Sequence, residues 1–238
     1  MKAHQHRDRP PARYSTVEDS HPAVLPGILA SLAGLVLFAI IAEAVVHLDR
    51  ITEWDIRALQ WLHSGTSPLG IEVFTAVSLF GSPLFLACLG LIVAAFLIRK
   101  QQWNHLAGWC VALIGGEILE SILKFLIQRP RPENAAPLLA HFSYSLPSGH
   151  AMTSMIAYIM LSYVLVTVWK PGRTWRIGIV ATATLLMIGI GFSRVYLGVH
   201  YVSDVVAGFA GGTFWVFLCI SATIFLQNRS NAGAERKP

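Results

Sequence analysis

Long apolar runs alternate with short polar segments along most of the chain. The runs occupy residues 25–46, 69–98, 104–126, 149–168, 177–193 and 201–226. About 20 apolar residues are needed for a helix to cross the hydrocarbon core of a bilayer. Gly81-Ser82-Pro83 interrupts the second run and predicts a kink there. The pattern predicts an all-α, polytopic membrane bundle of six transmembrane helices.

Polar segments flank this predicted bundle at both ends. Residues 1–24 are mixed in charge and contain prolines, which is typical of a disordered tail, and residues 229–238 form a second short tail. We therefore expect one domain at residues 25–228. The chain is 54% hydrophobic and 13% charged, with a mean hydropathy of +0.56. Soluble domains carry about 25% charged residues, so the composition argues against a soluble protein.

The positions of Lys and Arg predict how the bundle is oriented. Most of the 18 basic residues fall on one predicted side of the membrane. They are Lys2, Arg7, Arg9, Arg13, Arg99, Lys100, Lys170, Arg173, Arg176, Arg229, Arg236 and Lys237. Because cytoplasmic loops are rich in Lys and Arg, we expect both termini to be cytoplasmic. The net charge of +5 is scattered between apolar runs, which favours anionic lipid headgroups over nucleic acid as a partner.

This orientation gathers four polar clusters at the extracytoplasmic face. They follow the third run, precede the fourth, end the fifth and precede the sixth. The clusters are Lys124 with Arg131, Ser148-Gly149-His150, Ser193-Arg194, and His200 with Asp204. Positive charge, two imidazoles and a carboxylate at one membrane depth indicate a site for an anion, of which phosphate is the simplest.

The first cluster belongs to the segment KFLIQRPRP at residues 124–132. Pro130 and Pro132 end the helix, so Lys124 is expected on its last turns and Arg131 on an extended exit. Lys offers a point charge and Arg a planar fork, and both suit one phosphate. The alternative is that these side chains reach lipid headgroups without binding a substrate.

The second cluster lies directly before an apolar run. Ser148 is suited to cap a helix, which directs the free amides of Gly149 and His150 toward an anion. Gly149 permits close approach of the backbone, and His150 is able to exchange a proton. An ordinary capped helix with an incidental histidine is the alternative.

The last cluster pairs an imidazole with a carboxylate. If the sixth helix begins near residue 199, His200 and Asp204 are i and i+4 on one helix face, about 6 Å apart. Asp204 then holds one ring nitrogen of His200 and leaves the other free as a nucleophile or base. Arg194 adds positive charge. A purely structural His–Asp pair is the alternative, although a carboxylate at membrane depth favours function.

Taken together, the order and spacing of these residues resemble a known signature. The first part is Lys124, six residues and then Arg131-Pro132. The second part is Pro147-Ser148-Gly149-His150. The third part is Ser193-Arg194, five residues, His200, three residues and then Asp204. This is similar to the three-part motif of the type-2 phosphatidic acid phosphatase superfamily, the lipid phosphate phosphatases. The motifs cover residues 124–204, and the predicted spans extend the likeness to residues 25–226.

The resemblance implies a role for each matched residue. His200 would attack phosphorus to form a phosphohistidine, Asp204 would orient it, and His150 would protonate the leaving oxygen and then activate water. Phosphoryl oxygens would be bound by Lys124, Arg131, Ser148, the Gly149 amide and Arg194. No cofactor or metal is expected, because fixed cations supply the positive charge that phosphoryl transfer requires.

The implied function is that of a metal-independent lipid phosphatase in the bacterial inner membrane, with no obligate protein partner. The chain resembles enzymes that act on undecaprenyl diphosphate or on phosphatidylglycerophosphate. Undecaprenyl diphosphate is the first substrate that we expect, and phosphatidylglycerophosphate, phosphatidate and lipid A phosphates are alternatives. A lipid phosphotransferase, an anion transporter and a vanadate-dependent haloperoxidase are the competing functions. A transporter would need a polar path to the cytoplasmic half, where Glu117 and Glu120 are the main polar residues. Haloperoxidases of this kind are soluble, which fits this chain poorly.

Three further features have structural interpretations. Glu120 precedes Lys124 by one helical turn, which favours an intrahelical ion pair over a proton path. Trp54 and Trp61 follow the first run and indicate an aromatic belt at the interface, in a loop. The loop at residues 133–146, with its aromatic residues, either contacts the lipid or covers the surface.

Overall fold

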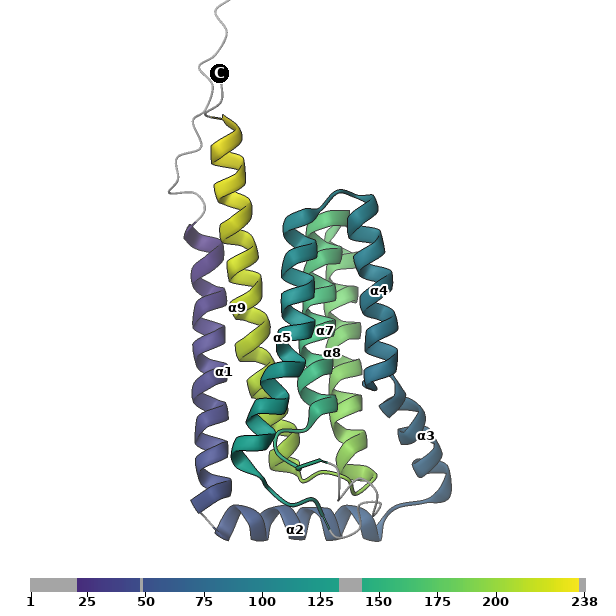
Figure 1. Ribbon diagram of the computed structural model, residues 1–238. Coiled ribbons are helices and arrows are strands. Elements are labelled where there is room, and N and C mark those ends of the chain that lie inside the picture. Colours follow the sequence, from purple (N-terminus) through teal and green to yellow (C-terminus); the bar gives the residue numbers. More distant parts are fainter. Residues whose placement is uncertain (1–20, 48, 133–142, 236–238) are drawn as a thin grey trace, which may run out of the picture.

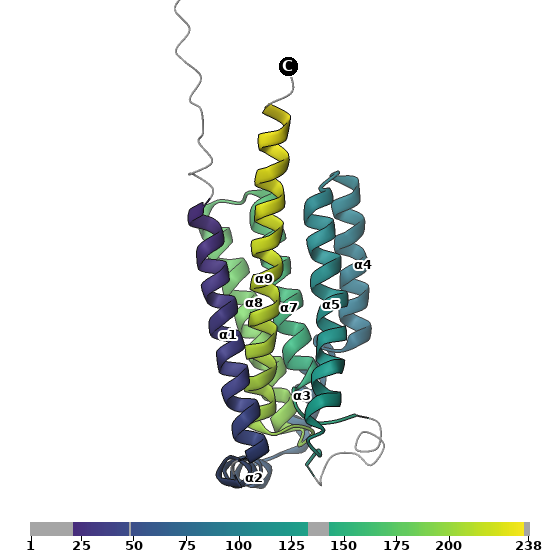
Figure 2. The same ribbon diagram turned by 60° about the vertical axis from the view of Figure 1, so that its left-hand side comes forward.

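The computed structural model describes residues 21–47, 49–132 and 143–235, and these residues form helices and connecting turns. The long helices of the described residues run side by side (Figures 1 and 2). They are α1 (His21–His47), α4 (Pro83–Arg99), α5 (Trp103–Ile127), α7 (Gly149–Val164), α8 (Arg173–Tyr196) and α9 (Val202–Glu235). The all-α membrane bundle expected from the apolar runs is confirmed.

Within the described residues, five stretches are long and apolar enough to cross a membrane, one fewer than predicted. They are Val24–His47, Pro68–Arg99, Gly149–Trp169, Arg173–Tyr196 and Val202–Ser230. The remaining predicted span corresponds to α5, whose C-terminal half carries three charged residues, Glu117, Glu120 and Lys124. Helix α5 nevertheless stands within the bundle, packed against α4, α7 and α9.

The second span is broken where its sequence predicted a kink. Helix α3 (Pro68–Leu79) ends before Gly81, and α4 begins at Pro83 after the N-cap Ser82. The Ser82 Oγ accepts a hydrogen bond from the Phe85 amide at 3.3 Å. A Cβ on Gly81 would lie 2.5 Å from Ile190 Cγ2, so only glycine lets this corner approach α8.

The later helices differ from the expected boundaries at their ends. The fourth span is completed by a π-helical turn, η2 (Leu165–Trp169), and α8 and α9 extend beyond residues 177–193 and 201–226. The predicted tail at residues 1–24 lies mostly outside the described residues, as do residues 236–238. Residues 133–142 of the predicted covering loop also lie outside the described part of the chain.

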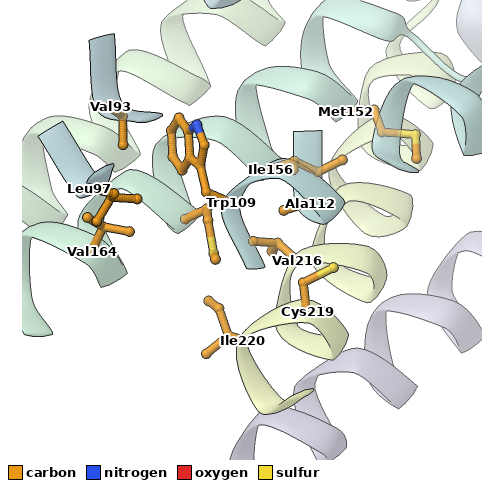
Figure 3. Packing of buried hydrophobic residues seen from close by; sticks show 11 residues of the cluster. Val93, Leu97, Trp109, Ala112, Met152, Ile156, Val164, Val216, Cys219 and Ile220 are labelled. Carbon is orange, nitrogen blue, oxygen red and sulfur yellow. The ribbon is translucent and has the colours of Figure 1, made fainter. Parts of the chain in front are cut away.

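The main apolar core lies between α4, α5, α7 and α9 (Figure 3). Trp109 of α5 is 1% exposed, and its Nε1 donates to the Gly90 carbonyl of α4 at 3.1 Å. Met152 and Ile156 of α7 and Val216 of α9 complete this cluster. Large apolar side chains on the outer faces, such as Leu91 at 73% and Leu185 at 71%, remain exposed. A bundle that is apolar both inside and outside is typical of a protein surrounded by lipid.

Helix α2 (Asp49–Ser64) lies across one end of the bundle (Figure 1). The sequence placed Trp54 and Trp61 in a loop, and this was wrong because the segment is an amphipathic helix. Both tryptophans are exposed, at 71% and 78%, whereas Leu59 is 7% exposed and packs against the bundle. Their exposure on a helix lying across the bundle end agrees with the expected position at a membrane interface.

Candidate active site

The four predicted clusters meet at the end of the bundle where α2 lies (Figure 1). The Ser148 amide at the start of α7 donates to the Asp204 carbonyl of α9 at 3.0 Å. The Arg131 Nη1, from the exit of α5, donates to the Val199 carbonyl between α8 and α9 at 3.0 Å. Segments that are distant in sequence are thus hydrogen-bonded to one another, as the helix order predicted.

His200 occupies the centre of this arrangement and is 2% exposed. It lies in the turn before α9 rather than on the helix, because α9 begins at Val202. Its Nδ1 lies 3.5 Å from Asp204 Oδ2, and its Nε2 lies 3.2 Å from Arg131 Nη1. A guanidinium only donates hydrogen bonds, so Nε2 is the acceptor and Nδ1 carries the proton that faces Asp204. This tautomer leaves a lone pair on Nε2.

Burial keeps the imidazole of His200 neutral. Desolvation is the largest influence and outweighs the attraction of Asp204, and it lowers the pKa of His200 to about 4. The positive charges of Arg131 and Arg194 act in the same direction. At neutral pH the ring therefore holds a free electron pair, which a nucleophile requires.

Asp204 is held on all sides and is fully buried. Its Oδ2 accepts hydrogen bonds from the Tyr201 amide at 2.9 Å and from the Ser145 hydroxyl. Its Oδ1 accepts a hydrogen bond from Arg129 Nη1 at 2.6 Å. These donors fix the plane of the carboxylate and satisfy its charge, which is a condition for burying it.

Lys124 and Arg131 converge through a residue of the following loop. Lys124 Nζ donates to Ser143 Oγ at 3.1 Å, and Arg131 Nη2 donates to the same oxygen at 3.3 Å. Arg131 Nε also donates to the Ser143 carbonyl at 2.9 Å. The expected ion pair is present as well, since Glu120 Oε1 lies 2.6 Å from Lys124 Nζ. The two cations therefore reach one place from different directions, as their spacing predicted.

The N-terminus of α7 presents unsatisfied polar groups to this place. Ser148 is the N-cap residue, but its side chain makes no capping bond, and its buried Oγ has no partner among the described residues. A Cβ on Gly149 would lie 2.6 Å from Glu120 Oε1, so any side chain here would displace the carboxylate of Glu120. The free amides at this helix end favour an anion.

His150 and Arg194 complete the set. His150 follows Gly149 on the first turn of α7 and lies beside Gly81, whose Cβ would be 3.4 Å from His150 Cδ2. Arg194 on the last turn of α8 donates to Ser78 Oγ at 2.6 Å, and its buried Nε has no partner in the described chain. Both residues lie within electrostatic reach of His200. The structure therefore brings all eight predicted site residues to one end of the bundle.

Sequence reasoning missed two residues of this region, Arg129 and Asp55. Arg129 Nη2 lies 2.8 Å from Asp55 Oδ2, while its Nη1 reaches Asp204. Burial alone would lower the pKa of Arg129, but the two carboxylates reverse this effect and raise it. A carboxylate within the apolar stripe of an amphipathic helix is the signal that would have identified Asp55.

Comparisons with known proteins match the chain over most of its length. Residues 105–227 match the PAP2 superfamily. Phosphatidylglycerophosphatase B of Bacillus subtilis is 34% identical over 188 residues, which cover 77% of this chain and 90% of that protein. An undecaprenyl-diphosphatase of Sulfolobus acidocaldarius is 31% identical over 134 residues, 54% of this chain and 60% of that protein.

The fold is also similar to a solved structure. The crystal structure of a transmembrane PAP2-type phosphatidylglycerolphosphate phosphatase from Bacillus subtilis superposes with a TM-score of 0.73 and 30% identity. The match covers 80% of this chain and 94% of that one. With its apolar helices, the protein is an integral membrane protein and a hydrolase of phosphate esters. This chain belongs to the PAP2 superfamily, the family whose motifs its sequence resembles.

Proposed function

We propose that the protein hydrolyses the terminal phosphate of a membrane lipid through a phosphohistidine on His200. The observation that carries this proposal is that the two ring nitrogens of His200 face different partners. Nδ1 faces Asp204 Oδ2 at 3.5 Å, and Nε2 faces the cation Arg131 at 3.2 Å. A phosphate bound by Arg131 would therefore sit beside the only ring nitrogen that has a lone pair.

The remaining groups supply charge and hydrogen bonds to the phosphoryl oxygens. Lys124, Arg131 and Arg194 are the cations, and the Gly149 amide and the Ser148 hydroxyl are the neutral donors. The unpartnered Ser148 Oγ and Arg194 Nε support this assignment, because buried polar atoms without partners in the described chain are suited to a ligand's oxygens. Such preorganised donors stabilise the charge of the transition state.

The reaction then proceeds in two steps. The Nε2 lone pair of His200 forms a bond to phosphorus while the bond from phosphorus to the lipid oxygen breaks, and His150 gives a proton to that oxygen. Water next attacks the phosphohistidine, His150 takes a proton from the water, and the phosphorus–nitrogen bond breaks to release phosphate. Asp204 stabilises the imidazole ring throughout, as in other nucleophile–base arrangements.

An apolar pocket of about 500 Å³ beside this site supports a lipid as the substrate. It lies between α4, α5 and α7, and Thr153 on its wall is bonded to the Gly149 carbonyl at 2.8 Å. Pro83, which also lines the pocket, is two residues from Gly81, which faces His150. The pocket thus begins near the group that protonates the leaving oxygen, where the hydrocarbon chain of the leaving alcohol must lie.

The likeness to the Bacillus subtilis protein favours phosphatidylglycerophosphate as the first lipid to test. Undecaprenyl diphosphate, expected from the sequence, follows because of the relative from Sulfolobus acidocaldarius. A panel of purified lipids that includes phosphatidate and lipid A should be compared by kcat/KM in wild-type protein. Phosphate release into water supports a hydrolase, whereas label transferred to an added lipid alcohol indicates a phosphotransferase. Absence of phosphate release from the whole panel would contradict the proposal.

The pocket offers a sharper test of the lipid substrate. Ala87 lines it on α4, and Ala87→Phe would fill part of its volume. We expect kcat/KM to fall about tenfold or more for a long-chain lipid phosphate and to stay within twofold for a short-chain one, since lost apolar burial costs ~1.5 kcal/mol or more. Leu84→Phe is the matched control, because Leu84 is 77% exposed and lies outside the pocket lining. Equal losses for both substrates would contradict this placement.

We further propose that the site faces the outside of a bacterial inner membrane and that both termini are cytoplasmic. The end of α4 and the connection from η2 to α8 lie at the bundle end opposite the site (Figure 2), and they carry Arg99 and Lys100, Lys170 after η2, and Arg173 at the start of α8. Their number supports this orientation through the bias of cytoplasmic loops toward positive charge. Labelling of single cysteines introduced at Lys100 and Thr66 in intact cells tests it, and we expect a membrane-impermeant reagent to label only the second.

A further inference from the structure

Asp55 is a buried carboxylate on the face of α2 that packs against the bundle. The bundle-facing stripe of α2 contains Thr52, Asp55, Leu59 and Leu62, spaced as one face of a helix. Asp55 is 4% exposed and Leu59 7%, whereas their neighbours Trp54 and Trp61 are exposed. A carboxylate at such a position is unfavourable unless partners satisfy it, so its partners should explain its presence.

The partners of Asp55 connect it to the nucleophile. Its Oδ2 lies 2.8 Å from Arg129 Nη2, and its Oδ1 accepts the Ser203 amide at 3.0 Å. The other branch of the same guanidinium, Nη1, lies 2.6 Å from Asp204 Oδ1. The other oxygen of Asp204 faces His200. A continuous path of buried charged groups thus runs from Asp55 through Arg129 to Asp204, which faces the neutral ring of His200.

The rigid guanidinium of Arg129 links the position of Asp55 to that of Asp204. Arg129 is planar and rigid, and each of its two terminal nitrogens is committed to one carboxylate. The position of Asp55 therefore sets the position of Nη1, and Nη1 sets the plane of the Asp204 carboxylate. Arg129 also lies over the Tyr201 ring, with its Cζ 4.3 Å from the centroid, which limits its movement further.

We propose that Asp55 and Arg129 are positioning residues that orient the Asp204–His200 pair, so that the interfacial helix α2 is part of the catalytic apparatus. This inference rests on the proposed role of His200 as the nucleophile. Neither residue touches the place where the phosphate would bind. They act through Asp204, as a residue outside the reacting set orients a ligating histidine in other sites.

Anchoring of α2 does not by itself require this ion pair. Leu59 already packs with Ala151, Val195 and Val205 of the bundle, and Leu62 lies against the same cluster. Buried ion pairs contribute little net stability compared with apolar residues of similar size, because both charges lose their hydration. Apolar residues at both positions 55 and 129 would fasten the helix equally well, so the charged pair points to a role in orientation.

The charges of the two residues act on His200 in opposite directions. Removing the charge of Arg129 leaves Asp204 less neutralised, so Asp204 stabilises the imidazolium more strongly and the pKa of His200 rises. Removing the charge of Asp55 leaves Arg129 less neutralised, which does not favour the imidazolium. The other charged or titratable groups facing His200 stay unchanged in these variants, namely Arg131, Arg194 and His150, and so does Lys124, which acts on His150.

The experiment compares Asp55→Asn, Arg129→Gln and Arg129→Lys in the full chain, with phosphatidylglycerophosphate or the best lipid of the panel as substrate. Glu53→Gln is the matched control, because Glu53 lies on the same helix in an exposed pair with Arg57. We expect Asp55→Asn and Arg129→Gln to lower kcat about tenfold or more, the range typical of orienting residues, with KM within twofold. Glu53→Gln should match wild type, and Arg129→Lys should recover part of the loss.

The pH dependence separates orientation from general structural damage. We expect the acidic limb of the kcat/KM profile to move to higher pH in Arg129→Gln. In Asp55→Asn it should stay in place or move to lower pH. Inhibition by inorganic phosphate should remain within twofold of wild type in both, which shows that the site is folded. If Arg129→Gln does not accumulate, Asp55→Asn still gives the kcat, the phosphate inhibition and an acidic limb that must not move to higher pH. If Asp55→Asn does not accumulate, Arg129→Gln gives the same readouts with an acidic limb that must move to higher pH.

Two results would overturn the inference. One is a kcat of Asp55→Asn within twofold of wild type, and the other is a loss of phosphate inhibition that parallels the loss of kcat in every variant. Failure of the proposed function is recognised separately. In that case wild type releases no phosphate, or His200→Ala retains its activity, whatever the α2 variants do.

Discussion

Glu120 Oε1 lies 2.6 Å from Lys124 Nζ, and both side chains are largely buried, at 10% and 14% exposure. The phosphate-binding lysine that we propose is thus already paired with a carboxylate on its own helix. An arriving phosphate must compete with Glu120 for the ammonium group. This pair therefore sets how tightly the site holds its anionic product.

Glu120→Gln should strengthen inhibition by inorganic phosphate. The amide keeps the size of the side chain but removes the competing charge, and a hydrogen bond to a charged group contributes about 1.5 kcal/mol or more. We expect the inhibition constant for phosphate to fall about tenfold. Glu43→Gln on α1 serves as the control, since Glu43 is exposed. An unchanged or weaker inhibition in Glu120→Gln would show that Lys124 does not bind the phosphate.

The pH profile should reflect the low pKa of His200. The attacking form is the neutral ring, and its pKa is lowered to about 4 by burial, compared with about 6.5 for an exposed histidine. As the pH falls, protonation of His200 therefore begins only near pH 5. After correction for the titration of the substrate and of the proton donor His150, kcat/KM should stay level from pH 7 to about pH 5 and fall near pH 4. An enzyme-linked fall centred near pH 6.5 would contradict the burial of this ring.

Activity should also survive the removal of divalent cations. Lys124, Arg131 and Arg194 are proposed to neutralise the phosphoryl oxygens, a task that other phosphoryl-transfer enzymes give to Mg²⁺. We expect phosphate release within twofold of the untreated rate in excess chelator. A loss that returns when Mg²⁺ or another divalent cation is added back would disprove the assignment.

The sequence predicted the catalytic and phosphate-binding residues, but not the residues that hold them in position. The converging clusters follow from counting apolar runs, because alternate helices must end on the same membrane face. The role of Arg129 was hidden, since an arginine at a helix end is equally suited to lipid headgroups, and only tertiary contacts show that it reaches Asp55 and Asp204.

Helix α2 was missed for a related reason. Its apolar stripe is interrupted by Asp55, and the residues around the stripe are polar or aromatic, so the segment resembles a surface loop. The described residues contain one candidate span fewer than predicted, because α5 was counted as an apolar run despite Glu117, Glu120 and Lys124. Charges within a helix lower its mean hydropathy without preventing it from joining a bundle, where a partner such as Lys124 satisfies Glu120.

The most direct measurement is to trap the covalent intermediate with a lipid substrate carrying labelled phosphate. Wild-type protein quenched in alkali should retain label in a linkage that is stable to base and labile to acid, as a phosphohistidine is. His200→Ala should show neither label nor phosphate release while remaining in the membrane. Label or turnover in His200→Ala within a few-fold of wild type would contradict the account.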